Sequence, residues 1–194
     1  MSTERRSPWL TAGIGAVGFV ALLWLIEVVD ALVGHRLDQY GVHPRTDEGL
    51  LGIVLAPLLH GGWLHLEANT VPTLVLLFLV LVSGLVRGLQ ATALIWLVGG
   101  VGLWLVAPSD TVHLGASVLI FGWFVYLLLR GFWNRSAGQV LLGVALFLVY
   151  GSLLLGVLPG EPGISWQGHL FGAVGGGLAA FLLAERGRPA RPVA

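Results

Sequence analysis

A serine and a histidine, the residue types that together support nucleophilic catalysis, stand at Ser117 and His169 within otherwise apolar stretches of this sequence. A histidine within hydrogen-bonding reach of a serine can accept its proton and make the hydroxyl a nucleophile at neutral pH. The oxyanion that then forms on a substrate needs donors, and His65 and Asn69, four residues apart on one helical face, can each offer an N–H group. Because no carboxylate occupies the matching faces of the segments around Ser117 and His169, a Ser–His dyad is predicted rather than a triad.

These polar residues also have structural alternatives. A single serine in a membrane helix usually hydrogen-bonds its own backbone or a neighbouring helix, and Asn69 can simply tie helices together. His60, which precedes the second apolar segment, can be an interfacial residue. A histidine within a membrane span is costly to bury and therefore indicates function more strongly. The catalytic hypothesis depends on whether four side chains lie at the same depth in the membrane: Ser117, His169, His65 and Asn69.

The composition predicts that the elements carrying these residues are membrane helices. Of 194 residues, 56% are hydrophobic and 10% are charged, whereas about 25% are charged in a typical soluble domain. The formal net charge is zero, so a nucleic-acid partner is not expected. The absence of cysteine excludes disulfides and thiol catalysis. We therefore expect an all-α, multi-pass protein whose surroundings are the lipid bilayer, without a cleaved signal peptide or a soluble domain.

The apolar stretches predict a single membrane domain over residues 1–194. The stretch 34–59 is predicted to be a membrane-associated loop, because its apolar part is too short to cross a bilayer. Six crossing helices are predicted, at about residues 9–33, 60–85, 89–106, 115–130, 137–157 and 165–184.

Six crossings would place both termini on the same side of the membrane. The arginines on that side are Arg5, Arg6, Arg87, Arg130, Arg135, Arg186, Arg188 and Arg191, whereas Arg36 and Arg45 fall on the other. Basic residues accumulate on the cytoplasmic side. Both termini are therefore expected in the cytoplasm.

Helix length then gives a depth for the polar residues. Ser117 precedes Arg130 by thirteen residues, or about 20 Å of helix in a hydrocarbon core about 30 Å thick. His169 precedes Arg186 by seventeen residues, or about 25 Å, so both side chains are expected up to about 10 Å below the outer surface. The second segment enters from the outside, so its polar residues descend to the same region. Irregular backbone before Ser117 at this depth predicts a water-filled cavity that opens outward.

Glycines predict close packing of the helices that carry the serine and the histidine. Gly168, Gly172 and Gly176 are spaced four residues apart, and Gly115 and Gly122 flank the serine. Small residues at this spacing let neighbouring helices approach at short range.

Three motifs in this order resemble those of the rhomboid intramembrane serine proteases. They are the sequences His60-Gly-Gly-Trp-Leu-His65-Leu-Glu-Ala-Asn69, Gly115-Ala116-Ser117 and Gly168-His169-Leu-Phe-Gly172. The resemblance covers residues 9 to 184 and implies a six-helix bundle that cleaves the transmembrane segments of other membrane proteins. It implies no cofactor and no metal, and a bacterial cytoplasmic membrane is our expectation for the location.

The resemblance also implies roles for individual residues. Ser117 would be the nucleophile and His169 the base. His65, Asn69 and Gly115 would form or support the oxyanion site, and Phe121 would pack against the catalytic histidine. The remaining motif positions, His60, Gly168 and Gly172, would be structural.

Two positions depart from the family pattern. Family members usually have glycine after the serine, where this chain has Val118, and a Trp-Arg pair common in the first loop is replaced nearby by Pro44-Arg45. Val118 motivates an alternative, a catalytically inactive rhomboid-like protein that binds membrane clients. A small transporter or channel is a third alternative, but it would require polar residues through the inner half of the membrane.

Three acidic residues within the apolar segments have no role in this scheme. Glu67 lies about 200° around the helix from His65 and Asn69, so it is predicted to point away from the site. Glu27 and Asp30, near the outer end of the first segment, are predicted to be interfacial rather than catalytic.

Overall fold

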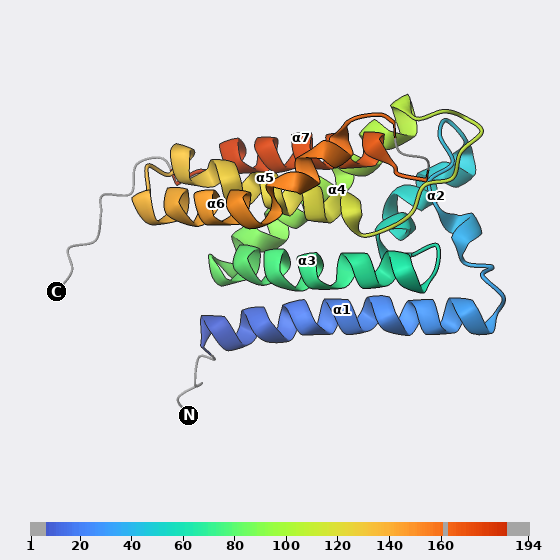
Figure 1. Cartoon of the computed structure of the whole chain (residues 1–194), viewed down its shortest axis with the longest axis horizontal. Helices are drawn as coiled ribbons and strands as arrows, with labels where there is room; N and C mark the ends of the chain where they lie inside the picture. The colour runs from blue at the N-terminus through green and yellow to red at the C-terminus, as the bar shows by residue number, and fades with distance from the viewer. Residues whose placement is uncertain (1–6, 161–162, 186–194) are drawn as a thin grey trace.

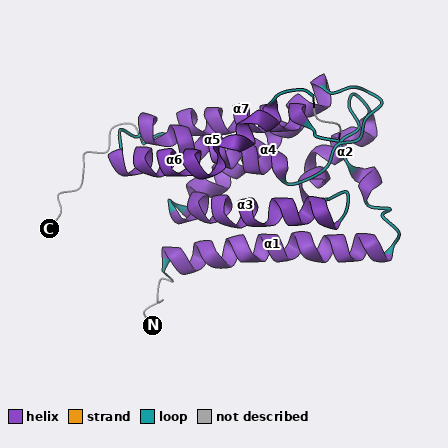
Figure 2. Cartoon of the chain, in the orientation of Figure 1, coloured by secondary structure: helices purple, strands orange, loops and turns teal. Residues whose placement is uncertain are grey.

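The computed structural model describes residues 7–160 and 163–185, and all regular secondary structure in this part of the chain is helical (Figures 1 and 2). The elements, in chain order, are α1 (Pro8–Leu32), η1 (Asp38–Tyr40), α2 (Asp47–Leu55), η2 (Ala56–Leu58), α3 (Trp63–Val82), α4 (Leu85–Val106), α5 (Ser117–Trp133), α6 (Ala137–Tyr150), η3 (Gly151–Val157) and α7 (Trp166–Leu182).

The long helices lie side by side in a bundle, with α1 against α3 at one edge (Figure 1). The start of α1 and the end of α7 lie at the same end of the bundle, and α2 lies at the opposite end (Figure 1). Helix α5 packs against α3, α4, α6 and α7, so it is the central element. Its aromatic residues Trp123, Phe124 and Tyr126 are among the most buried large side chains in the described part of the chain.

Within the described residues, four helical stretches are long and apolar enough to cross a membrane: Pro8–Leu32, Trp63–Val82, Leu85–Val106 and Ala137–Val157. The helices α5 and α7 have 17 residues each, which corresponds to about 25 Å. These two helices are shorter than the four spanning stretches, because the residues directly before each of them are not helical. Five arginines that support the predicted orientation, Arg5, Arg6, Arg186, Arg188 and Arg191, lie outside the described residues.

Several predicted helix boundaries differ from the structure. The second long helix begins at Trp63 and not at His60. Gly62, directly before it, has a φ of +110°, which is not helical, so the helix cannot extend back through this residue. The third begins at Leu85, four residues before the predicted start, and Gly84 has a φ of +139°. The fifth remains α-helical only to Tyr150 and continues as a 3₁₀ helix to Val157.

The predicted membrane-associated loop contains the short helix α2, which is fastened to α4. The Thr46 hydroxyl accepts a hydrogen bond from the Gly49 N–H at 3.0 Å and so caps the first turn of α2. Two indoles on α4 donate back to this segment: Trp96 to the Ile53 carbonyl at 2.9 Å and Trp104 to the Thr46 carbonyl at 3.0 Å. These bonds hold the loop against the bundle.

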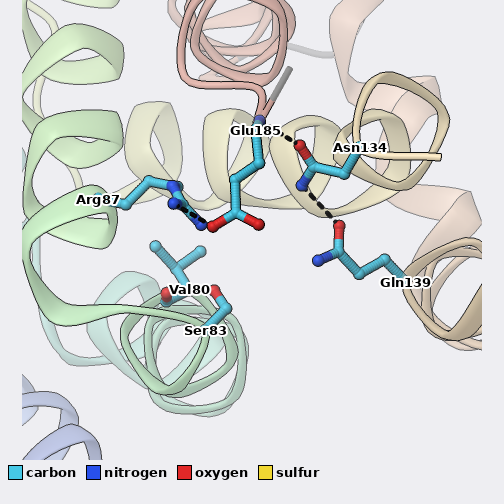
Figure 3. Close-up of polar contacts among 6 residues, drawn as sticks. All are labelled: Val80, Ser83, Arg87, Asn134, Gln139 and Glu185. Carbon is cyan, nitrogen blue, oxygen red and sulfur yellow. Dashed lines mark hydrogen bonds and ion pairs between the residues drawn. The ribbon is translucent and has the colours of Figure 1, made fainter. Parts of the chain in front are cut away.

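A polar network joins four elements at the end of the bundle where α1 begins and α7 ends (Figures 1 and 3). Arg87 at the start of α4 pairs with the carboxylate of Glu185, which follows α7. The Glu185 N–H donates to Asn134 Oδ1 at 2.8 Å, and Asn134 Nδ2 donates to Gln139 Oε1 of α6 at 2.8 Å. In the same region the Ser83 hydroxyl donates to the Val80 carbonyl at 2.7 Å (Figure 3). The network fixes the ends of α4, α5, α6 and α7 relative to one another.

Candidate active site

Ser117 and His169, 52 residues apart in the sequence, lie within hydrogen-bonding distance. The distance from His169 Nε2 to Ser117 Oγ is 3.0 Å. Ser117 is the first residue of α5, and His169 lies in the first turn of α7. The structure thus brings together the two side chains for which the sequence predicts a dyad.

Glycines on α7 make this distance possible. A Cβ atom at Gly172 would lie 2.1 Å from the Val118 carbonyl oxygen, and one at Gly176 would lie 2.1 Å from the Gly122 carbonyl oxygen. The two helices therefore pack backbone to backbone, as the glycine spacing predicts. Gly168 differs from the prediction: its open side faces Ser165 and Leu103 instead of α5.

The imidazole ring of His169 is held on two further sides. Its Nδ1 atom lies 2.9 Å from the carbonyl oxygen of Gly156 in η3. A carbonyl can only accept, so Nδ1 carries the proton and Nε2 presents its lone pair to the Ser117 hydroxyl. The ring of Phe121 stacks on the imidazole, with 4.0 Å between centroids and 9° between planes. This is the contact that the resemblance implied for Phe121.

The Gly156 carbonyl was not predicted from the sequence. A Cβ at Gly156 would lie 2.9 Å from Phe121 Cζ and 3.1 Å from His169 Nδ1, so only glycine fits here without displacing the rings. The acceptor is a backbone carbonyl, which every residue has, so no side-chain type in the sequence indicates that this glycine contacts His169.

His65 and Asn69 converge on the residue two positions before the serine. Gly115 has a φ of +122°, and a Cβ there would lie 2.7 Å from His65 Nε2 and 3.7 Å from Asn69 Nδ2. Asn69 Nδ2 is buried and has no hydrogen-bond partner among the residues that the structure describes. The N–H of Ser117, as the first residue of α5, has no carbonyl one turn back within the helix. Three N–H-bearing groups are thus available near the serine for a developing negative charge.

His60 lies behind this group and contacts the backbone that carries Ser117. Its Nε2 atom accepts a hydrogen bond from the Ala116 N–H at 3.4 Å, and its ring lies edge-on to that of His65, with 5.2 Å between centroids. His60 is 1% exposed, and burial, with a smaller effect of the charge on His65, lowers its pKa from 6.5 to about 3. His60 is therefore neutral at physiological pH and can act as this acceptor.

A cavity of about 1030 Å³ contains the serine and the histidine. Its walls come from α3, α5, α7 and the irregular segments before α5 and α7, and its polar lining includes His65, Asn69, Ser117 and His169. Much of the remaining lining is apolar, which suits an extended apolar peptide segment.

His113, which the sequence analysis did not consider, connects the segment before α5 to the start of α7. Its Nδ1 lies 2.8 Å from Ser165 Oγ, and its Nε2 lies 2.7 Å from Thr111 Oγ1. Its backbone pairs with Val42, with N–O distances of 2.7 and 3.1 Å. Burial lowers the pKa of His113. Its position in the segment predicted to dip into the membrane before Ser117 was the available signal.

The two departures from the family pattern, at Val118 and at Pro44-Arg45, are not among the residues that line the cavity. Val118 is not part of the lining of the large cavity, and its side chain is directed at α4. Arg45 Nη1 donates to the carbonyls of Leu105 at 3.1 Å and Ala107 at 2.6 Å, where it neutralises the C-terminal end of α4. Glu67 is exposed and does not line the cavity, in agreement with its predicted direction.

The family model of the rhomboid domain matches residues 47–186. An uncharacterized protein of Mycobacterium tuberculosis is 47% identical over 97% of this chain and 82% of its own length. An uncharacterized protein of Mycobacterium leprae is 43% identical over 97% and 78%, respectively. The Bacillus subtilis protein named "Putative rhomboid protease YdcA" is 35% identical over 86% and 85%. No solved structure matches the chain.

Proposed function

The chain belongs to the rhomboid family, and we propose that it is an intramembrane serine endopeptidase that cleaves transmembrane segments of other membrane proteins. One observation carries this proposal: His169 Nε2 lies 3.0 Å from Ser117 Oγ while its Nδ1 is held by the Gly156 carbonyl. This is the protonation state that a general base needs before the reaction begins.

The reaction then follows the chemistry of a serine nucleophile. Ser117 Oγ forms a bond to the carbonyl carbon of the scissile peptide as its proton moves to His169 Nε2. The carbonyl oxygen becomes an oxyanion, which Asn69 Nδ2, His65 and the Ser117 N–H stabilise by hydrogen bonds. The imidazolium gives its proton to the leaving amine as the C–N bond breaks. A water molecule, activated by the same histidine, then hydrolyses the acyl-enzyme and restores Ser117.

The membrane placement is part of the proposal. Four apolar helices of spanning length, the family and the charge distribution support an integral protein with six crossings and both termini in the cytoplasm. The curated relatives above are bacterial, which supports a bacterial cytoplasmic membrane. Cleavage would then occur near the outer ends of substrate helices.

Cleavage of a purified single-span membrane protein in liposomes tests the proposal. The wild type and the exposed-serine control Ser109→Ala are expected to cleave it, whereas Ser117→Ala and His169→Ala are not. A fluorophosphonate probe, which reacts with activated serines, is expected to label the wild type but not Ser117→Ala. Cleavage that persists in both dyad variants would refute the assignment, and a folded wild type that neither cleaves nor takes the probe would favour the client-binding alternative.

A further inference from the structure

Four ionisable side chains that take no part in the proposed reaction lie together at the end of α1. They are Glu27 and Asp30 in the last turns of the helix, and His35 and Asp38 in the chain that follows it. One ligand atom from each of Asp30, His35 and Asp38 lies within 4.8 Å of the other two. Glu27 and Asp30, three residues apart, share a helical face.

The backbone after α1 turns back over the helix end and so brings these groups together. The His35 N–H donates to the Asp30 carbonyl at 2.8 Å, and the Leu37 N–H donates to Asp30 Oδ1 at 2.7 Å. Gly34 and His35 have φ values of +73° and +58°, in the left-handed region that reverses the chain direction. Asp38 then begins η1 and faces the helix end.

The carboxylate oxygens in this cluster lack the partners that burial requires. Glu27 is 1% exposed and Asp30 is 2% exposed. Glu27 Oε1 and Oε2, Asp30 Oδ2 and Asp38 Oδ1 are buried without a hydrogen-bond partner among the described residues. His35 Nδ1 lies 3.5 Å from Asp30 Oδ2, within ion-pair distance but longer than an ordinary hydrogen bond. The cluster therefore holds several buried carboxyl oxygens that no described group satisfies, and leaving buried polar atoms unsatisfied is costly.

We infer that Asp30, His35 and Asp38, with the Glu27 carboxyl group one helical turn before Asp30, bind a divalent transition-metal ion, with Mn²⁺ and Zn²⁺ as the best matches. Carboxylate oxygens suit Mn²⁺, and imidazole suits Zn²⁺ and its neighbours, whereas Mg²⁺ and Ca²⁺ take oxygen ligands. Neighbouring ligand atoms of a tetrahedral zinc ion are about 3.4 Å apart. The three ligand atoms lie within 4.8 Å of one another, so side-chain rotations of about 1 Å would bring them to one ion.

The cluster is open to water on one side. His35 has 49% of its side chain exposed and Asp38 is half-buried, while the two α1 carboxylates lie beneath them. The end of α1, which carries the site, lies at the end of the bundle opposite the start of α1 and the end of α7 (Figure 1). A bound ion would join the end of α1 to the chain that leads into α2, and would stabilise the folded state by mass action. The proposed site differs from the expectation, drawn from the sequence, of no metal, and the titrations below decide between the two.

Metal binding can be measured independently of proteolysis. Protein purified with a chelator and then exchanged into chelator-free buffer is titrated with Mn²⁺, followed by electron paramagnetic resonance, and with Zn²⁺, followed by calorimetry. One ion per chain and a rise in the melting temperature are expected. The expected order of affinity is Mn²⁺ and Zn²⁺ above Mg²⁺ and Ca²⁺.

Variants distinguish the cluster from non-specific binding. Glu27→Gln and Asp38→Asn are expected to weaken Mn²⁺ binding at least about tenfold and to abolish the metal-dependent rise in melting temperature. Glu48→Gln, which removes an exposed carboxylate from the first turn of α2, is the matched control and is expected to bind as the wild type does. A wild-type dissociation constant weaker than about 1 mM for both ions would overturn the inference. Equal binding by Mg²⁺, or equal losses in Glu48→Gln, would overturn it as well.

Discussion

The Cγ2 methyl group of Val118 occupies the space that the missing side chain of Gly99 leaves open on α4. A Cβ atom at Gly99 would lie 2.4 Å from that methyl group. The residue after Ser117, the proposed nucleophile, is glycine in most members of the family, and here its valine side chain is accommodated by a glycine on the neighbouring helix. The valine therefore does not narrow the cavity, and it gives little support to an inactive protein.

Gly99→Ala is expected to destabilise the protein by about 1–3 kcal/mol, because the new methyl group overlaps Val118 and pushes the start of α5 away from α4. Val118→Ala removes the overlapping methyl group, so the double variant Gly99→Ala/Val118→Ala should recover most of that loss. Thermal unfolding of the two single variants and the double variant measures the coupling. Additive effects in the double variant would show that the two side chains do not compete for this space.

Asn69→Ala is expected to reduce the rate of substrate cleavage about 10²- to 10³-fold, because it removes a donor near the developing oxyanion. Its effect on stability should be small, since Asn69 Nδ2 has no partner among the described residues that the change would leave unpaired. The Ser117–His169 bond is not touched by the substitution. Single-turnover cleavage and thermal unfolding, measured on the same preparation, separate the two effects. A loss of stability with unchanged cleavage would contradict the oxyanion role.

Gly156→Ala is expected to slow both cleavage and fluorophosphonate labelling, because the added methyl group would lie 2.9 Å from Phe121 and 3.1 Å from His169. The displaced imidazole would lose its alignment with the Ser117 hydroxyl. Gly138→Ala is the matched control: a Cβ at this α6 glycine meets no described atom within 4 Å. The control should retain activity and gain up to about 1 kcal/mol of helix stability. Full labelling of Gly156→Ala would show that the stacked pair tolerates the methyl group.

Lowering the pH from about 6.5 towards 4 is expected to reduce the stability of the fold. The pKa of His60 is about 3 in the folded protein, because the ring is buried, and about 6.5 in the unfolded chain. Between these values the unfolded chain binds a proton that the folded protein does not, so stability rises with pH across the window and is fully present above it. The lowered pKa of His113 acts in the same direction.

Each such histidine contributes a slope of at most about 1.4 kcal/mol per pH unit. Melting temperatures measured across this range should fall as the pH falls, and His60→Gln, which keeps a polar group but cannot titrate, should show a shallower dependence. An identical slope in the wild type and His60→Gln would show that His60 does not carry the effect.

The pairing of Ser117 with His169 could be predicted from the sequence, because helix rise converts residue numbers into depth and glycine spacing predicts which helices approach closely. The start of α3 after Gly62 could not, because a positive φ depends on the turn that the surrounding chain imposes. The direction of Val118 depends on the rotation of α5 about its axis, which the packing of α4 and α7 determines.

Contacts through the backbone were the least predictable part of the site. The Gly156 carbonyl that holds His169 and the pairing of Val42 with His113 involve groups that every residue possesses. The burial of the acidic residues of α1 could not be predicted for a different reason. The sequence places Glu27 and Asp30 near the helix end, which predicts an interfacial position, but it does not show that the chain after α1 folds over them and buries both.

The partner of His169 Nδ1 is an uncharged carbonyl, and this determines where charge arises during the proposed reaction. Before a substrate binds, Ser117, His169 and Gly156 carry no net charge, so the resting protein bears no cost for an ion at this depth. When the serine attacks, the imidazolium and the oxyanion appear together and a short distance apart. Each is then the counter-ion of the other. The substrate carbonyl therefore supplies the negative charge that a carboxylate supplies in a triad, and ion formation is confined to the moment at which a peptide bond is in place.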